Sequence, residues 1–363
     1  MEIEDRLREL EARGVRIIDR RQVFIAPEVK LERIFPGAEL YPGTRLLGVR
    51  TLVGTGAKIG TEGPAVISDS VIGTGAEVKS GFLDRATLLS RAVAGANAHF
   101  RAGTLLEEEA STAHAVGLKQ TILMYGVTLG SLINLCDILV SGGRSRQEHT
   151  EVGSGFVHFN YTPYGVHGDK ATPSLIGNVA EGVFLDTEPI FLGGMSGMVG
   201  PSRVGFGAMT AAGQVIRKEI PAGTMSMGVG AEFSRAFSRK EAPSGEHKAR
   251  KLARNREFLE QLIMLREWYK GVRIARAEGE EKMVLEAALE TIDEAINERL
   301  KRYNSFAREW GMEEISLGRF RAEPEAVEID FRKDLGYFEF VKSLTEEEKS
   351  QISTRIFEKI WYN

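Results

Sequence analysis

Aliphatic residues recur every six positions along much of the first two thirds of the chain, and this spacing predicts its architecture. Leu40, Leu46 and Leu52 show the period. An aliphatic residue followed by glycine marks further repeats at Val53, Ile59, Ile72, Ile176, Val199 and Val204. A period of six gives one short strand and one tight turn per repeat, and three repeats can close one coil of a parallel β-helix. The pattern therefore predicts stacked coils with an aliphatic interior. An antiparallel β domain with many glycine turns is the weaker alternative, because long alternating strands are missing.

The distribution of glycine separates this body from the rest of the chain. Of the 40 glycines, 33 lie between Gly37 and Gly230, one precedes them and six follow. Glycine destabilises a helix interior by about 1 kcal/mol relative to alanine, but it suits a chain that turns every few residues. From His247 to Trp310 the sequence is instead rich in Ala, Leu, Glu, Lys and Arg, with apolar residues three, four and seven positions apart. This region therefore predicts two amphipathic helices with a break near Gly271 to Gly279.

Three segments follow from these patterns. We expect an N-terminal helix and linker over residues 1–30, a β-helix over residues 31–235 and a helical region over residues 245–363. Near the end of the chain, Thr345 precedes three glutamates and is expected to cap a helix that starts there. The predicted fold is thus mainly β, followed by an α-helical C-terminal region.

Composition and charge exclude several classes of protein. The chain of 363 residues has a formal net charge of -4 and a sequence pI near 6.0, so it lacks the overall basic field that binds nucleic acids and anionic membranes. It contains no apolar run long enough to span a membrane, and its charged N-terminus lacks the apolar core of a signal peptide. The single cysteine, Cys136, cannot form an intramolecular disulfide. We therefore expect a cytoplasmic protein with no nucleic-acid and no membrane partner.

Several motifs in the predicted β-helix have counterparts in a known family. Arg101 and Lys119 lie eighteen residues apart, residues 130–137 read Gly-Ser-Leu-Ile-Asn-Leu-Cys-Asp, and residues 207–213 read Gly-Ala-Met-Thr-Ala-Ala-Gly. In these motifs the chain resembles the hexapeptide-repeat transferases. Over about Leu10 to Glu219 it is similar to the acetyltransferase half of the bifunctional uridyltransferase and acetyltransferase that makes UDP-N-acetylglucosamine. The resemblance implies a left-handed parallel β-helix, a hand that the period alone does not give. The family's Gly-x-Gly-Thr-x-Met loop has no counterpart, so nucleotidyl transfer by this chain is not expected.

The resemblance assigns one set of residues to a sugar phosphate or sugar nucleotide. They are Arg101, Lys119, Asn134, Asn160, Tyr161 and Lys170. A guanidinium fork and an ammonium can together neutralise a phosphate in a partly shielded groove, so Arg101 and Lys119 suit this role, although solvated charges on an outer face are the alternative. Asn160 and Tyr161 can hydrogen-bond to a sugar or stack on it, but they would also suit a corner of the β-helix.

The catalytic position departs from the family pattern. The family's catalytic histidine corresponds to Ser131, and its partner tyrosine corresponds to Asn134. Acetyl transfer to an amine needs a base with a pKa near neutral, and a serine needs its own activator before it can act. Candidate substitutes on the same or nearby coils are His149, His158, His114 and His167. We expect Ser131 with His149 or His158 to form the catalytic group, or the chemistry to have been lost.

The remaining expectations concern the donor, metals and assembly. The resemblance assigns Thr187, Ala211 and Ala212 to the binding of acetyl-CoA or another acyl-CoA. The six histidines do not pair at metal-ligand spacing, so no metal is predicted. The resembling family forms trimers with the active site between neighbouring subunits, so we expect a homotrimer.

Two functions stay open on the sequence alone. The first is an acyltransferase that moves an acyl group from a thioester cofactor to a phosphorylated or UDP-linked amino sugar. The second is a binding or regulatory module that still recognises a sugar nucleotide but has lost acetyl transfer together with the catalytic histidine. A purely structural scaffold would leave the shared register of Arg101, Lys119 and Ser131 to coincidence.

Overall fold

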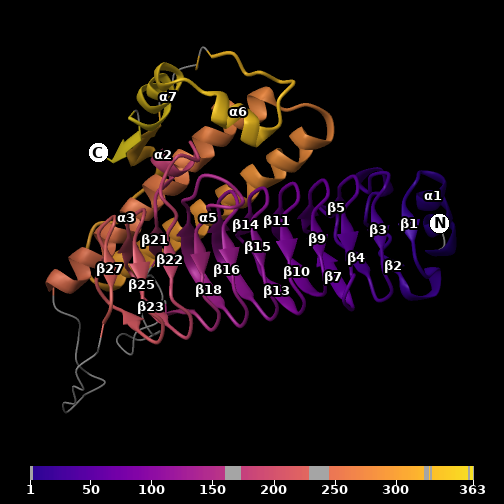
Figure 1. The fold of residues 1–363 in the computed structure, drawn as a ribbon, viewed down its shortest axis with the longest axis horizontal. Helices are drawn as coiled ribbons and strands as arrows, with labels where there is room; N and C mark the ends of the chain where they lie inside the picture. The colour runs from indigo at the N-terminus through magenta and orange to yellow at the C-terminus, as the bar shows by residue number, and fades with distance from the viewer. Residues whose placement is uncertain are drawn as a thin grey trace.

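A stack of parallel β coils forms the long axis of the molecule, and helices pack along one side of it (Figure 1). The computed structural model describes residues 3–159, 173–228, 245–322, 327, 329–358 and 360–362. The solenoid has about 11 turns and is followed by a helical region, so the predicted fold class, a left-handed parallel β-helix with an α-helical C-terminal region, is confirmed.

Each coil contributes strands to three faces, which we call A, B and C in chain order. Face A is one parallel sheet of 11 strands. They are β1 (Arg16–Ile17), β3 (Glu39–Leu40), β6 (Lys58–Ile59), β9 (Glu77–Val78), β12 (Val93–Ala94), β15 (Ser111–Thr112), β17 (Thr128–Leu129), β19 (Glu151–Val152), β22 (Phe191–Leu192), β25 (Met209–Thr210) and β27 (Met225–Ser226).

Faces B and C form one sheet, because β16 (Gly117–Leu123) and β18 (Asn134–Val140) turn the corner between them and belong to both. The other strands of face B are β2 (Phe24–Ile25), β4 (Arg45–Leu47), β7 (Ala65–Ser68), β10 (Gly81–Asp84), β13 (Ala98–Phe100), β20 (Val157–Phe159), β23 (Gly197–Val199) and β26 (Val215–Ile216). The other strands of face C are β5 (Leu52–Val53), β8 (Val71–Ile72), β11 (Ala86–Leu88), β14 (Thr104–Leu106), β21 (Ser174–Ile176) and β24 (Arg203–Val204).

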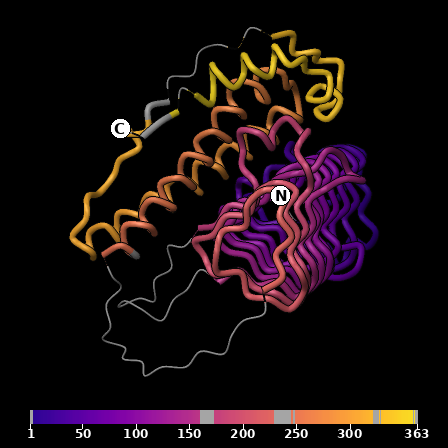
Figure 2. The backbone as a smooth tube through the Cα atoms, turned by 60° about the vertical axis from the view of Figure 1, so that its left-hand side comes forward, coloured from indigo at the N-terminus to yellow at the C-terminus, as the bar shows by residue number. Residues whose placement is uncertain are grey.

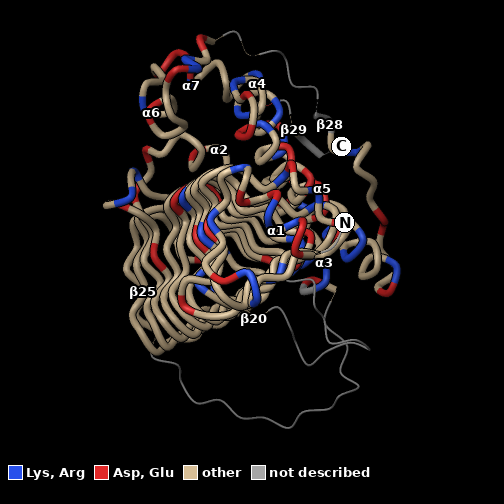
Figure 3. Tube along the Cα trace, turned by 90° about the vertical axis from the view of Figure 1, so that its right-hand side faces the viewer, with Lys and Arg blue, Asp and Glu red and all other residues tan. Residues whose placement is uncertain are grey.

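Residues one coil apart stack in register and build aliphatic columns inside the coils. On face A, Leu40 pairs with Ile59, and Ile59 pairs with Val78; all three are completely buried. Successive side chains of a strand point to opposite sides of the sheet, so the residues beside them, such as Lys58, point outward. In Figure 3 the charged residues lie in short runs on the surface of the coils and along the helices. The aliphatic repeat in the sequence is therefore the interior of the coils.

Face C is apolar on both of its sides. In β14, Leu106 belongs to the interior cluster and Leu105 to a second cluster shared with the helices, and both are completely buried. Val53 and Leu52 of β5 divide in the same way. A strand covered on both faces reads as a continuous apolar run. The aliphatic pairs of face C were therefore a signal in the sequence for the face that the helices cover.

The helical region lies against face C, as Figure 2 shows for the orange helices beside the stacked coils. Its long helices are α3 (Gly245–Trp268), which continues through a π-helical turn (Tyr269–Arg273) into α4 (Ile274–Arg276), and α5 (Gly279–Glu309). Short elements are α1 (Ile3–Ala12), α2 (Val179–Gly182), α6 (Tyr337–Ser343) and α7 (Glu346–Ile352), a second π-helical turn (Ser353–Phe357), the 3-10 turns Arg20–Gln22, Leu31–Arg33 and Leu317–Arg319, and the antiparallel pair β28 (Phe320–Ala322) and β29 (Ile360–Tyr362). α5 contacts β8, β11 and β14 directly.

The helix ends follow the sequence signals. Thr345 accepts a hydrogen bond from the Glu348 N–H, and the Glu348 carboxylate accepts one from the Thr345 N–H, so the predicted cap of α7 is present as a reciprocal capping box. Of the helices that the structure describes, none combines the length and the apolar character needed to cross a bilayer.

Candidate functional site

A histidine and a serine from consecutive coils meet at the corner between faces A and B. His114 lies in the turn between β15 and β16, and Ser131 lies one coil later, between β17 and β18. The strands that flank the two turns are paired in register. His114 Nδ1 therefore lies 2.9 Å from Ser131 Oγ. The His114 ring is exposed to solvent, so a ligand can reach it.

The length of one coil is the sequence signal that could have identified His114 as the histidine beside Ser131. His114 precedes Ser131 by 17 residues, which is also the spacing between Ser111 and Thr128, a pair in register on face A. A residue one coil earlier occupies the same corner, one strand spacing away, about 4.8 Å. The Ser131 N–H donates to Ser154 Oγ at 3.0 Å, which ties the serine's backbone to the next coil.

His158 lies inside the coils. Its Nδ1–H donates to the Cys136 carbonyl oxygen at 2.6 Å, and its Nε2 accepts from the Ser174 hydroxyl at 2.8 Å. The residue is only 4% exposed, and burial lowers the pKa of its imidazole to about 4. Both ring nitrogens are engaged and the ring is neutral at pH 7, so these contacts favour a structural role over the catalytic role expected from the sequence.

His149 lies in the loop that leads into face A at β19. Its Nδ1 is 2.8 Å from the Arg146 carbonyl oxygen. Ser131 follows face A whereas His149 precedes it, so the width of this face lies between them. We expected His149 to lie beside Ser131, but the structure separates the two residues. His114 is the histidine that contacts the serine.

Arg101 and Lys119 lie in adjacent coils at the opposite edge of face B. The Arg101 N–H donates to the Leu118 carbonyl oxygen at 2.9 Å, which fixes the register of the two strands. Adjacent strands are about 4.8 Å apart, so the two cations are neighbours. They line a cavity of about 200 Å³ whose other residues are Gln120, Cys136, Asp137, Glu298 and Arg302. The sequence anticipated the pair of cations but not Glu298 and Arg302, which come from α5.

Asn134 lies between the two edges of face B. It is exposed at the start of β18, where it pairs with Gly117 of the previous coil. The other expected sugar-binding residues, Asn160, Tyr161 and Lys170, lie outside the described residues, as does His167.

Two further chemistries find no support near these residues. Burial raises the pKa of the Cys136 thiol to about 12, so it is protonated at pH 7 and is no nucleophile. Across the described part of the chain, no group of three or more His, Cys, Asp or Glu residues is arranged to hold a metal ion.

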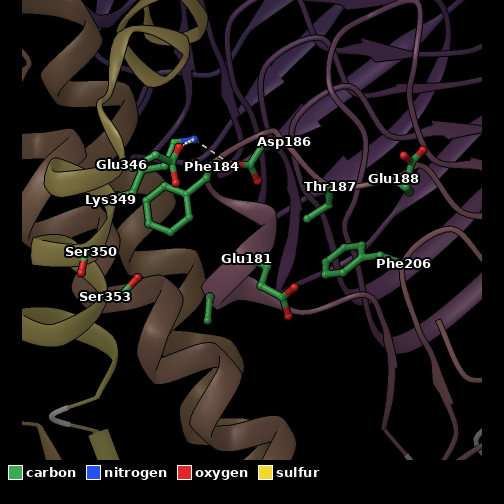
Figure 4. Close-up of a pocket in the computed structure, with 11 residues that line it drawn as sticks. Glu181, Phe184, Asp186, Thr187, Glu188, Phe206, Glu346, Lys349, Ser350 and Ser353 are labelled. Carbon is green, nitrogen blue, oxygen red and sulfur yellow. Dashed lines mark hydrogen bonds and ion pairs between the residues drawn. The ribbon is translucent and has the colours of Figure 1, made fainter. Parts of the chain in front are cut away.

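The three residues expected to bind the acyl donor are not brought together. Thr187 lines a cavity of about 500 Å³ between the segment after α2 and α7 (Figure 4). Ala211 and Ala212 follow β25, at the corner between faces A and B. The cavity around Thr187 is rimmed by Glu181, Asp186, Glu188 and Glu346. Among the described residues that line this cavity the cation is Lys349, whose Nζ lies 2.8 Å from Asp186 Oδ2, so this acidic rim does not suit the phosphates of an acyl-CoA.

Comparison with known proteins supports the resemblance drawn from the motifs. No protein-family model matches the chain. The bifunctional protein GlmU of Clavibacter sepedonicus is 28% identical over 223 residues, which is 61% of this chain and 40% of that protein. GlmU of Thermus thermophilus is 33% identical over 216 residues, which is 59% of this chain and 42% of that protein. The matched region thus spans about two fifths of these relatives.

Matches to solved structures are weaker. LpxA from Acinetobacter baumannii aligns over 78% of this chain and 95% of its own, with 15% identity and a TM-score of 0.28. The polysialic acid O-acetyltransferase OatWY aligns over 63% of this chain and 93% of its own, with 14% identity and a TM-score of 0.21. The sequence matches, together with the stacked hexapeptide coils, confirm that this chain resembles the GlmU proteins over about 60% of its length.

Proposed function

We propose that this chain is a hexapeptide-repeat acyltransferase that moves an acyl group from acetyl-CoA or another acyl-CoA to the amine of a phosphorylated or UDP-linked amino sugar. The observation that carries the proposal is the contact between His114 Nδ1 and Ser131 Oγ. It supplies an imidazole beside the residue that occupies the family's histidine position. The similarity to GlmU proteins over 61% of the chain supports the same class of reaction.

His114 acts as the general base in this proposal. In the competent tautomer its Nδ1–H donates to Ser131 Oγ, so Nε2 carries the lone pair that accepts a proton from the attacking amine. The amine nitrogen forms a bond to the thioester carbonyl carbon, and the carbon–sulfur bond breaks. The thiolate leaves and takes up the proton held by the imidazolium. Ser131 thus orients the base and does not itself abstract a proton.

Arg101 and Lys119 hold the phosphate of the acceptor at the other edge of face B. Five residues separate His114 from Lys119, and a strand rises about 3.3 Å per residue, so the two Cα atoms are at most ~16 Å apart. The long cationic side chains and an amino sugar phosphate can bridge this span. Asn134 is exposed along this span, and in this proposal its amide hydrogen-bonds to a sugar hydroxyl.

Replacement of His114 tests the base. His114→Ala should lower kcat by about 10²- to 10⁴-fold, the usual contribution of a general base. Thiol release from acetyl-CoA, with glucosamine-1-phosphate or UDP-glucosamine as acceptor, measures the rate. Ser131→Ala should lower it by less, since the imidazole is retained.

His149→Ala is the matched control for this measurement. It removes a histidine at the other edge of face A, away from Ser131, so the rate should not change. A rate unaffected by His114→Ala, or abolished by His149→Ala, would assign the chemistry to another group.

We also propose a homotrimer in the cytoplasm. Leu132, directly after Ser131, is 63% exposed and Met195 at the same corner is 84% exposed. Both have a left-handed backbone, with φ of 57° and 50°. A neighbouring subunit packed over them would shield the His114–Ser131 pair from water. Light scattering at micromolar concentration should give a mass near three times 40.0 kDa, and Leu132→Glu should reduce it; a monomeric wild type would contradict the assembly.

The second candidate is a binding module without acyl transfer. The observation that favours it is the serine at position 131, where the family carries its catalytic histidine. This candidate predicts that a sugar nucleotide binds while no thiol is released with any of the acceptors above. In that case His114→Ala should leave ligand affinity unchanged.

A further inference from the structure

Two adjoining hollows lie where the corner between faces B and C meets α5. The first is the 200 Å³ cavity that contains Arg101 and Lys119. The second measures about 440 Å³ and is lined by Arg85, Ala102, Lys119, Gln120, Glu294, Asn297, Glu298 and Lys301. Lys119, Gln120 and Glu298 line both, so the two hollows lie on either side of these shared side chains. The helical region therefore extends the proposed phosphate site into a larger one within a single chain.

The first hollow is lined by three cations and two carboxylates; of the carboxylates, Asp137 pairs with Arg299 and Glu298 pairs with Arg302. Arg302 of α5 is a third cation beside Arg101 and Lys119, and its Nε donates to Glu298 Oε1 at 2.8 Å, which orients the guanidinium. Arginine and lysine together hold adjacent phosphate groups through charge-assisted hydrogen bonds. Three cations in this cavity suit the two linked phosphates of a diphosphate.

The second hollow offers groups that suit a nucleoside. Gln120 and Asn297 supply amide donors and acceptors, and Glu294 and Glu298 supply acceptors for hydroxyl groups. The Gln120 amide is held in place, since its Nε2 donates to the Ala102 carbonyl oxygen at 3.2 Å. Gly103 makes this possible, because a Cβ atom there would lie 2.4 Å from the Gln120 side chain.

The order of these groups along the chain decides how an acceptor would lie. β16 begins at Gly117, next to the turn of His114, passes through Lys119 on face B and turns at Gln120 onto face C. The base, the phosphate cations and the second hollow therefore follow one another across the surface. A sugar monophosphate with its amine at His114 would reach Lys119 and leave the second hollow empty.

We propose that the acceptor is a nucleoside-diphosphate-linked amino sugar and not a sugar monophosphate, and that α5 provides part of its binding site. The amino sugar lies over face B toward His114, the diphosphate lies among Arg101, Lys119 and Arg302, and the nucleoside occupies the hollow beside Asn297 and Lys301. The inference rests on the proposed function for the orientation of the sugar. The new element is the contact between the nucleoside and α5, and a binding measurement tests this contact without any measurement of activity.

Calorimetric titration of the full chain tests this assignment. The probes are UDP, UDP-N-acetylglucosamine and N-acetylglucosamine-1-phosphate. UDP and the UDP-sugar should bind at least tenfold more tightly than the sugar monophosphate. Asn297→Ala and Lys301→Ala should each lower the affinity for UDP by about 3- to 10-fold, since one hydrogen bond is lost in each case. The affinity for the sugar monophosphate should not change. Arg302→Ala should weaken UDP and the UDP-sugar.

Lys282→Ala is the matched control, because it removes an exposed lysine from the same helix away from both hollows. Equal affinity for UDP and the sugar monophosphate, or UDP binding unaffected by both Asn297→Ala and Lys301→Ala, overturns the inference. If thiol were still released with glucosamine-1-phosphate, the proposed transferase reaction would stand even though the nucleotide site was wrong. Conversely, UDP binding that depends on Asn297 without any thiol release would remove the transferase reaction and keep the nucleotide site.

Discussion

The interior of the coils and the contact between the coils and the helices are both buried, but they are built differently. Inside the coils, equivalent positions carry similar aliphatic residues, such as Leu46, Ile67 and Leu83 on face B. Against the helices the packing is aromatic and irregular. Phe184 lies with its ring centroid 6.0 Å from that of Trp268 and 6.3 Å from that of Phe357.

The contact between the coils and the helices also contains buried charged side chains, unlike the aliphatic columns inside the coils. Arg273, in the π-helical turn, is 1% exposed and pairs with Glu107 at 3.1 Å and with Glu108. Its Nη1 also donates to the Tyr269 hydroxyl, and its guanidinium lies 4.0 Å from the centre of the Tyr337 ring. A buried ion pair of this kind adds little stability over an apolar contact but strongly disfavours any arrangement that separates it. We therefore expect these charges to specify where the helices sit.

Loss of Arg273 should give the largest effect. Arg273→Ala leaves two carboxylates buried without their cation and should lower the free energy of unfolding by about 3–5 kcal/mol. Urea denaturation, monitored by tryptophan fluorescence, measures this free energy, since Trp268, Trp310 and Trp361 all belong to the C-terminal region. Arg50→Ala is the control.

Arg50 pairs with Glu290 and Glu294 near the surface, so its loss should cost below about 1 kcal/mol. Adding Glu107→Gln and Glu108→Gln to Arg273→Ala should recover part of the lost stability. Equal effects of Arg273→Ala and Arg50→Ala would show that the buried charges do not specify the docking of the helices.

Two adjacent leucines separate the regions directly. Leu106→Ala and Leu105→Ala each remove a completely buried side chain and should cost about 2–5 kcal/mol. Leu106 faces the coil interior and Leu105 faces the helices. Leu105→Ala should therefore lower the urea midpoint of the tryptophan transition more than that of the β-sheet transition seen by circular dichroism. Leu106→Ala should lower the midpoint of the β-sheet transition at least as much as that of the tryptophan transition. Identical shifts of both transitions in both variants would mean that the two regions unfold as one unit.

Acidification should destabilise the fold through His158, the histidine that lies inside the coils in the described part of the chain. Burial lowers the pKa of His158 to about 4 from its ordinary value of 6.5, so the unfolded chain binds more protons between these values. Stability should therefore fall as the pH drops from 6.5 toward 4, by up to about 3 kcal/mol for this group. Urea midpoints for the wild type and His158→Gln across this range measure the difference.

Glu108 acts in the opposite direction, because burial raises its pKa to about 6 and its protonation favours the fold as the pH falls. The His158 contribution is therefore obtained as the difference between wild type and variant, in which the Glu108 contribution cancels. A variant with the same pH dependence as the wild type would contradict a neutral, structural His158.

The sequence predicted the coil body well because its signals are local and repeated. Six-residue spacing, glycine at the turns and the cap at Thr345 each depend on neighbours in the chain. The register that places Arg101 beside Lys119 follows from coil length in the same way.

The site was predicted less well, because adjacency across coils depends on the length of each individual coil. His149 lies 18 residues after Ser131 and His114 lies 17 residues before it, so distance along the chain does not distinguish the two histidines. His114 makes the contact, because one coil of 17 residues separates it from Ser131 and brings both residues to the same corner. His158 lies on an inward position of its strand, which the alternation of β20 places among Leu135 and Met198.

The sequence by itself determined the stacked coils, the aliphatic interior, the helical C-terminal region and the pair of cations on face B. Each follows from a period or from a motif of fixed spacing. Only the tertiary structure decided how α5 lies across face C, that Arg273 is buried against Glu107 and Glu108, and that Arg302 lines the same cavity as Arg101. These contacts join residues more than 160 positions apart, and no local pattern encodes them, because they depend on how α5 crosses the finished coils.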